Sequence, residues 1–317
     1  MFSMTSREQE IINGFDFQNP DILRGDDAAT VPLSDHSLVV SQDTLCEGVH
    51  FDLAFCTPED VAHRAIHANL SDMAAMGLNG HMVLQSVAIP KQLSGEWIQR
   101  YIQAFNALMK AHHLTLIGGD VCHSQHGLMI TITIMNQCSK DMAISRHGAI
   151  PGDLIAVTKP PGFAALGLEA LKRNHNTSDS ALFKACFLRP EAQNALACDV
   201  RHTGYVHAML DSSDGLVDSL NHLIECSQVG ITIDVDQLPS TPEFIKTCEH
   251  FELDPISLQL NGGEDFGLVM SIHADLLEHV PPNTIYPIGH VTDEATLKLM
   301  HHGQPYSIGK TGFSHFE

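Results

Sequence analysis

The sequence of 317 residues lacks several features that mark whole classes of proteins. It has no apolar run near the roughly 20 residues of a membrane span, and residues 1–15 show no basic start followed by an apolar block. Basic residues are scarce, with 17 Lys and Arg against 38 Asp and Glu, so the formal net charge is −21. Because so acidic a surface repels phosphate backbones, we expect no binding to nucleic acids. The missing apolar run and the missing signal pattern lead us to expect a cytoplasmic protein that does not bind membranes.

Common nucleotide and metal motifs are missing as well. There is no GxGxxG, and Gly309-Lys310-Thr311 is not a P-loop, because Gly303 stands one residue too far away and only six residues follow. The eight cysteines form no CxxC pair, and no HExxH is present. We therefore expect reduced, mostly structural thiols rather than disulfides or a zinc site.

Helical and strand patterns mix in both halves of the chain and predict an α/β or α+β protein. The length favours two domains, and the turn at 149–153 places the boundary so that residues 1–148 form one domain and 149–317 the other. In the first domain we predict a short helix up to Phe15, helices at 57–76 and 94–113, and strands at 37–41, 82–89, 114–117 and 128–135. In the second we predict helices at 163–173, 180–188, 190–202, 216–227 and 242–251, and strands at 154–158, 206–210, 231–235, 266–272 and 285–289.

Short acidic turns recur at the predicted ends of these elements. They are GDDAA at 25–29, SQDT at 41–44, NLSD at 69–72, GGD at 118–120, DSSDGL at 211–216 and GGED at 262–265. Carboxylates bind Mg²⁺, and glycines let the backbone approach phosphate closely. Each turn alone could be an ordinary polar turn or helix cap. Their number favours a phosphate site with several metals, which so acidic a protein would need between its carboxylates and its substrate.

Three of these turns allow a more specific prediction. Asp43 is expected just past a strand end, a common position for a ligand. Asp72 is expected in the last turn of a helix, where the macrodipole disfavours a carboxylate unless a cation lies nearby. Gly118 and Gly119 are expected in a turn after a strand that ends at residue 117, where they would offer N–H groups to phosphate while Asp120 reaches the bridging metal.

Other candidates have equally simple alternatives. Ser213 or Asp214 could just cap the following helix, although a helix N-terminus also binds phosphate. Glu264 could contact a cationic substrate or only form a turn. Arg146, near the domain boundary, could hold a nucleotide phosphate or be a solvated surface arginine.

Taken in order, the motifs closely resemble the thiamine-monophosphate kinase family. GDDAA, SQDTLCEGVHFD, NLSDMAAMG, LIGGD, SRHGAIPGD, DSSDGL and NGGEDF occur in the family's order from about residue 24 onward. The wider group includes aminoimidazole ribonucleotide synthetase, selenophosphate synthetase and a hydrogenase maturation protein. The resemblance implies the two-domain aminoimidazole ribonucleotide synthetase-like fold. Its N-terminal domain binds ATP and Mg²⁺ and pairs with a twin into the β-barrel core of a homodimer, and its C-terminal domain is α+β.

The resemblance also implies roles for individual residues. The metal ligands would be Asp27, Ser41, Gln42, Asp43, Asp72, Asp120, Asp211 and Asp214, and catalysis through the metals would fall to Asp27, Asp43, Asp72, Asp120 and Asp211. ATP would be contacted by Gly119, Asp120, Arg146 and Ser213, and thiamine monophosphate by His50, Glu264 and Phe313. Gln42 departs from the family, which usually has Thr there, although an amide can still supply one oxygen.

The expected reaction is phosphorylation of thiamine monophosphate by ATP to thiamine diphosphate, the last step of thiamine diphosphate biosynthesis. It would proceed by direct in-line transfer with several Mg²⁺ ions. The acceptor phosphate has a second pKa of about 6 and is largely dianionic at pH 7, so no catalytic base is needed. Two alternatives stay open: a sister ATP-dependent synthetase of the same fold, and a nucleotide-binding scaffold without turnover. The second is supported by Gln42, which replaces the usual Thr of the family.

Overall fold

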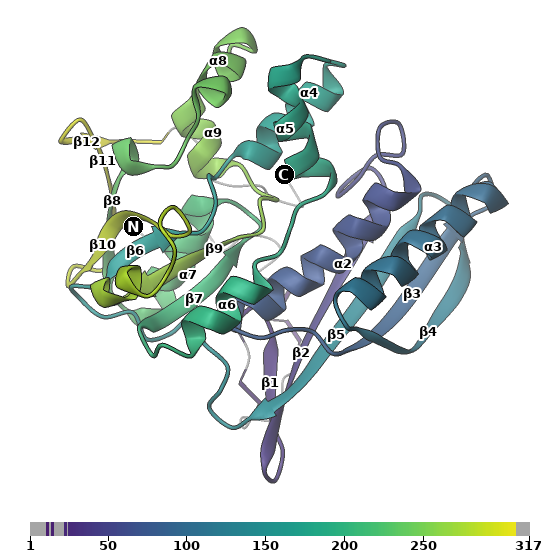
Figure 1. Cartoon of the computed structure of the whole chain (residues 1–317), viewed down its shortest axis with the longest axis horizontal. Helices are drawn as coiled ribbons and strands as arrows, with labels where there is room; N and C mark the ends of the chain where they lie inside the picture. The colour runs from purple at the N-terminus through teal and green to yellow at the C-terminus, as the bar shows by residue number, and fades with distance from the viewer. Residues whose placement is uncertain (1–10, 13, 16–21, 24, 309–317) are drawn as a thin grey trace.

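The computed structural model describes residues 11–12, 14–15, 22–23 and 25–308 (Figure 1). Most of the helix predicted up to Phe15 lies outside these residues, and so does Phe313. Among the described helices, none is both long and apolar enough to cross a membrane.

The N-terminal half is a five-stranded sheet with two helices packed on one face (Figure 1). Its strands are β1 (Ala29–Pro32), β2 (His36–Cys46), β3 (Met82–Pro90), β4 (Thr115–Ser124) and β5 (Met129–Ser139), in the order β1-β2-β5-β3-β4. The helices are α2 (Pro58–Ala75) and α3 (Gly95–Ala111). Neighbouring strands are antiparallel except β3 and β4, which are parallel.

The C-terminal half is built on a seven-stranded sheet. Its strands are β6 (Leu154–Val157), β7 (Val206–Ser212), β8 (Gly230–Asp234), β9 (Gly267–Ile272), β10 (Tyr286–Thr292), β11 (Leu297–His301) and β12 (Gln304–Tyr306), in the order β12-β11-β8-β10-β6-β9-β7. The helices are α4 (Phe163–Lys172), α5 (Ser178–Leu188), α6 (Asn194–Arg201), α7 (Leu216–Ser227), α8 (Pro242–His250) and α9 (Pro255–Asn261). The predicted mixed α/β architecture is confirmed.

Helix α2 joins the two halves. The predicted helix start near residue 57 is confirmed: Thr57 and Asp60 form a capping box there, and Pro58 occupies the first helical turn. Most of α2 is buried, because one side packs on the first sheet while its end packs on the second half. Ala74 and Ala75 share a core cluster with Met209 of β7. The C-terminal end of α2 is therefore where side chains from both halves can meet.

One predicted turn is wrong. Strand β4 does not end at residue 117 but continues to Ser124, so Gly118, Gly119 and Asp120 lie inside a strand. Glycine in a strand often marks a close backbone approach. At Gly119 an added Cβ would lie 1.8 Å from the carbonyl oxygen of Gln85 on β3, so only glycine fits there.

Other boundaries differ less. Asp43 lies within β2 rather than past its end. The strand was predicted at 37–41, whereas β2 extends from His36 to Cys46. The sequence missed β1, α9, β11 and β12. The domain boundary between residues 148 and 149 stays a prediction, and it falls in the connection between β5 and β6.

Candidate active site

The last turn of α2 holds the centre of the candidate site. Ser71 and Asp72 follow one another there and reach different neighbours. Ser71 Oγ donates to Asp211 Oδ2 over 2.7 Å, whereas Asp72 Oδ2 accepts a hydrogen bond from Ser41 Oγ. The predicted place of Asp72 in the last turn is confirmed. Since that turn carries no basic residue, the helix dipole adds to the negative potential around Asp72.

Strand β2 presents Ser41 and Asp43 toward α2. Both pair with isoleucines of β5 that are at most 1% exposed, and residues paired across two strands share a face of the sheet. Gln42 lies between them and faces the opposite side, where its amide donates to Thr133 Oγ1 over 2.7 Å. Within this chain Gln42 is therefore separated from Ser41 and Asp43, and its role as a metal ligand stays a prediction.

The end of β7 supplies Asp211, and the connection from β7 to α7 supplies Ser213. Asp211 is 5% exposed and accepts hydrogen bonds from Ser71 Oγ at 2.7 Å and Ser213 Oγ at 3.1 Å. Gly215 precedes α7 with a φ of +118°, a backbone conformation that favours glycine. The loop thereby turns sharply enough to keep Asp211 beside α2 and to start α7 next to it.

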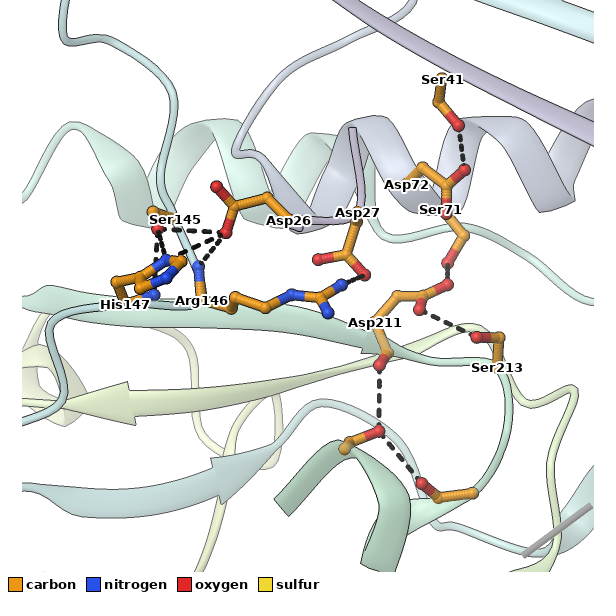
Figure 2. A network of polar contacts seen from close by, with 12 residues as sticks. Asp26, Asp27, Ser41, Ser71, Asp72, Ser145, Arg146, His147, Asp211 and Ser213 are labelled. Carbon is orange, nitrogen blue, oxygen red and sulfur yellow. Dashed lines mark hydrogen bonds and ion pairs between the residues drawn. The ribbon is translucent and has the colours of Figure 1, made fainter. Parts of the chain in front are cut away.

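The turn at residues 25–27 brings in two aspartates with different partners (Figure 2). Asp26 Oδ1 accepts from the backbone N–H of Arg146 over 2.8 Å and from Ser145 Oγ over 3.1 Å. Asp27 Oδ1 lies 3.1 Å from the Arg146 guanidinium. Its other oxygen, Oδ2, is buried without a hydrogen-bond partner. Arg146 thus borders the aspartates, and its expected contact with ATP stays a prediction.

Asp27, Asp72 and Asp211 converge in one buried cluster (Figure 2). Each offers a carboxylate oxygen, and these atoms lie within 4.8 Å of one another. Burial and the neighbouring carboxylates raise the pKa of Asp211 to about 8 and that of Asp72 well above its usual value. Burial also raises the pKa of Asp27, although Arg146 opposes this shift. Such a cluster favours a proton or a cation, and its all-oxygen donor set suits Mg²⁺.

A pocket of about 680 Å³ opens beside this cluster, between α2 and the second half. Its acidic end includes Asp43, Asp72, Asp211 and Asp214, and its apolar wall includes Ala68, Leu168, Phe187, Leu253 and Leu258. Burial, together with the charges of Glu264 and Asp27, raises the pKa of Asp43 to about 6. The volume is in the range of pockets for small organic ligands. An anionic group at the acidic end and a ring along the apolar wall would fit this division.

The two expected substrate contacts, His50 and Glu264, both line the pocket, and the structure adds Arg64 to them. Arg64 is on α2 and 1% exposed. Its guanidinium pairs with Glu264 and donates to the backbone carbonyl of His50 over 2.8 Å. Nothing in the sequence distinguished this arginine from a solvated one, because its partners are far away along the chain.

Gly119 and Asp120 do not reach the cluster within this chain. Asp43 and Gly119 lie at the same level of the sheet but three strands apart, which is about 14 Å at a strand spacing of roughly 4.8 Å. Asp120, the next residue, is exposed on the opposite face of the sheet from Asp43. The metal and ATP roles of both residues stay predictions.

A second group of potential metal ligands lies elsewhere along α2. His63 and His67 both approach Glu191, with their Nε2 atoms 3.1 and 3.6 Å from its carboxylate oxygens. However, His67 Nδ1 accepts a hydrogen bond from the backbone N–H of Ala192 over 3.0 Å. Burial lowers the pKa of His67 to about 2, so the ring is neutral and carries its proton on Nε2. That nitrogen is not a metal ligand in this arrangement.

Comparisons with known proteins agree over nearly the whole chain. The family models "AIR synthase related protein" match with their N-terminal domain at residues 25–137 and their C-terminal domain at 151–302. The thiamine-monophosphate kinase of Haemophilus influenzae is 32% identical over 306 residues, covering 92% of this chain and 91% of the relative. That of Bacillus subtilis is 31% identical and covers 94% of both. A solved structure described as AaThiL complexed with AMPPCP and TMP has 27% identity and a TM-score of 0.86, with 100% of both chains covered.

Proposed function

Because the chain belongs to the thiamine-monophosphate kinase family of AIR synthase related proteins, we propose that it transfers the γ-phosphoryl group of ATP to thiamine monophosphate. The products would be thiamine diphosphate and ADP. The observation that carries this proposal is the buried cluster of Asp27, Asp72 and Asp211 at one end of a pocket with an apolar wall. The solved structure that superposes on this chain is described as holding TMP and an ATP analogue, AMPPCP.

The cluster fits Mg²⁺. Asp27 Oδ2 is buried without a hydrogen-bond partner, and burial together with the neighbouring carboxylates raises the pKa of Asp72 and of Asp211. Asp27, Asp72 and Asp211 would hold the ions, with Asp43 and Asp214 at the pocket's acidic end completing the set. When bound, Mg²⁺ neutralises phosphate charge and aligns the donor and acceptor for in-line transfer.

The chain's own part in the reaction is to hold two phosphates in line and to exclude water. The acceptor is a phosphate monoester that is largely dianionic at pH 7, so no side chain has to remove a proton from it. Ser213 stands between Asp211 and the start of α7, where backbone N–H groups favour an anion. The thiamine rings would lie along the apolar wall, beside Glu264 and His50.

The expected ATP contacts at Gly119 and Asp120 require a second copy of the chain. Strand β4 is an edge strand in which nine of ten residues are exposed, and Val121 is 73% exposed. A long exposed edge with apolar side chains is a template for pairing with another strand. We infer a homodimer in which β4 pairs with the partner's sheet and closes a barrel. Asp120 of the partner subunit would then approach the sheet face that carries Gln42.

We also expect the protein to work in the cytoplasm. ATP is the co-substrate of the proposed reaction, and the eight cysteines are free, as is usual in a reducing compartment.

The decisive experiment measures ADP release from Mg²⁺ and ATP with thiamine monophosphate, with thiamine and with no acceptor. ADP and thiamine diphosphate are expected only with the monophosphate, and EDTA should abolish both. Asp72→Asn should lose turnover, while Asp60→Asn is the matched control, because Asp60 is a buried aspartate at the other end of α2, outside the pocket. ATP binding without turnover would favour a scaffold, and turnover with another acceptor would favour a sister synthetase.

A further inference from the structure

Arg64 connects three segments that meet at the pocket. From α2, its guanidinium donates to the backbone carbonyls of His50 and Phe187 and pairs with Glu264. His50 lies in the connection before α2, Phe187 on α5, and Glu264 in the loop before β9. The guanidinium also lies 4.2 Å from the centre of the Phe187 ring. One buried side chain thus joins the first half of the molecule to a helix and a loop of the second.

The loop that carries Glu264 has an unusual backbone. Glu264 has a φ of +70° and Phe266 a φ of +48°, in the left-handed region that few residues other than glycine adopt. Such conformations persist when the surroundings over-determine them, and they cluster at functional sites. Here Asp265 anchors the loop, because its carboxylate accepts from the backbone N–H groups of Gly162 at 2.6 Å and Ala164 at 2.7 Å.

Glu264 itself is held at two points. Its backbone N–H donates to the carbonyl of Ser213 over 2.7 Å, and its Oε2 accepts from Arg64. Its Oε1 is left for a ligand in the pocket that Glu264 lines, and about a third (34%) of its side chain is exposed. These two anchors, one on the backbone and one on Oε2, fix the direction from which the carboxylate can meet a cation.

We propose that Arg64 is a positioning residue that makes the site select phosphate monoesters carrying a cationic heteroaromatic ring. Its forked guanidinium binds both the Glu264 carboxylate and the His50 carbonyl and so fixes their relative positions. In this position Glu264 contacts the positive ring of the acceptor. This inference rests on the proposed function and adds the reason for its substrate class. An acceptor with a neutral ring gains little from Glu264, so it loses little when the fork is disturbed.

Lysine cannot replace this arginine. Two guanidinium nitrogens serve three acceptors while the flat group lies over Phe187. An ammonium is a point charge without a fixed fork and does not stack in this way. Arg64→Lys therefore keeps the charge and removes the geometry.

The test is steady-state kinetics of Arg64→Lys with two acceptors: thiamine monophosphate and the phosphate ester of the neutral hydroxyethylthiazole. We expect KM for thiamine monophosphate to rise about tenfold, as for a weakened hydrogen bond to a charged group. Both kcat and the KM for ATP should stay within a few-fold, and kcat/KM for the neutral acceptor should hardly change. Arg189→Lys is the matched control, because Arg189 pairs with Asp60 between the same two halves but outside the pocket.

A double-mutant cycle with Glu264→Gln separates positioning from a general structural role. Arg64→Lys should have little further effect on KM once the Glu264 charge is gone. A full tenfold effect in that background, or equal losses for both acceptors and for ATP, would overturn the inference. If thermal unfolding shows that Arg64→Lys is not folded, Arg64→Gln is the second variant. It keeps a flat amide that can donate to one acceptor but removes the fork, and the same split in KM is expected. Lack of wild-type turnover with thiamine monophosphate would instead refute the proposed function itself.

Discussion

Replacing Asp211 by asparagine should stabilise the metal-free protein while it abolishes turnover. Asp211 is 5% exposed, and burial is the main cause that raises its pKa from 3.8 to about 8. The change to asparagine removes the charge but keeps the size of the side chain. Ser71 and Ser213 can still hydrogen-bond to the amide, because a hydroxyl group both donates and accepts.

The sign of the effect follows from proton linkage. A carboxyl group whose pKa is raised by folding binds its proton more tightly in the folded state. The resulting stability is complete below the unfolded pKa near 3.8 and is lost as the pH rises through the folded pKa near 8. For a shift from 3.8 to about 8, the loss is about 2 kcal/mol at pH 5 and about 5 kcal/mol at pH 8.

The variant does not regain all of this folding free energy, because the neighbouring aspartates also account for part of the unfavourable charge and because the amide makes weaker hydrogen bonds. We expect a net gain of about 2–3 kcal/mol at pH 8, which corresponds to a Tm increase of roughly 5 °C or more. At pH 5 the difference from wild type should be small.

The assay is thermal unfolding of both proteins at pH 5 and pH 8, in EDTA and in Mg²⁺. Mg²⁺ should raise the Tm of the wild type more than that of Asp211→Asn, so that the difference between the two Tm values becomes smaller or changes sign. Asp153→Asn is the control, because Asp153 is also buried but already has His207 and Ser271 as partners. It should lower the Tm at both pH values. A lower Tm for Asp211→Asn than for wild type at pH 8 in EDTA would refute the cost assigned to the buried Asp211 charge.

Three further predictions concern catalysis, assembly and metal binding. Asp72→Asn should reduce kcat at least about 10³-fold in the ADP-release assay, and activity near that of the Asp60→Asn control would remove Asp72 from the metal site. Val121→Lys, which places a charge on the exposed edge of β4, should shift sedimentation velocity from dimer to monomer and lower turnover; an unchanged dimer would exclude β4 as the interface. Wild-type Tm at pH 8 should rise with Mg²⁺ concentration, and an unchanged Tm would argue against binding at the buried cluster.

The sequence was most informative where local signals agreed with packing. The start of α2 was predicted correctly, because Thr57, Pro58 and Asp60 satisfy the free N–H groups of the first turn regardless of what surrounds the helix. The strand predicted at 128–135 also agrees with β5, where isoleucine and threonine alternate from residue 130 to 134. Its isoleucines are buried under the helices, and Thr131 and Thr133 lie on the other face. Both signals act within a few residues of the chain.

Signals that depend on distant partners failed. The sequence predicted a turn at Gly118 and Gly119, and only the close approach of Gln85 on β3 explains why glycine stands at position 119 within a strand. Arg64 could not be singled out either, since its contacts at residues 50, 187 and 264 come from three separate segments. Tertiary proximity of this kind is not encoded in any short window of the sequence.

Sheet geometry also divides the predicted metal ligands in a way that their order along the chain does not show. Ser41 and Asp43 face α2 and the buried cluster, whereas Gln42 and Asp120 lie on the other face of the same sheet. Under the proposed function this division would give two phosphate-binding regions, one within the chain and one that needs the edge strand of a second copy. In that proposal the departure at Gln42 concerns only the second region, so it would alter how ATP is held without weakening the cluster around Asp72. The same sheet therefore reconciles a changed residue at position 42 with an intact acidic centre.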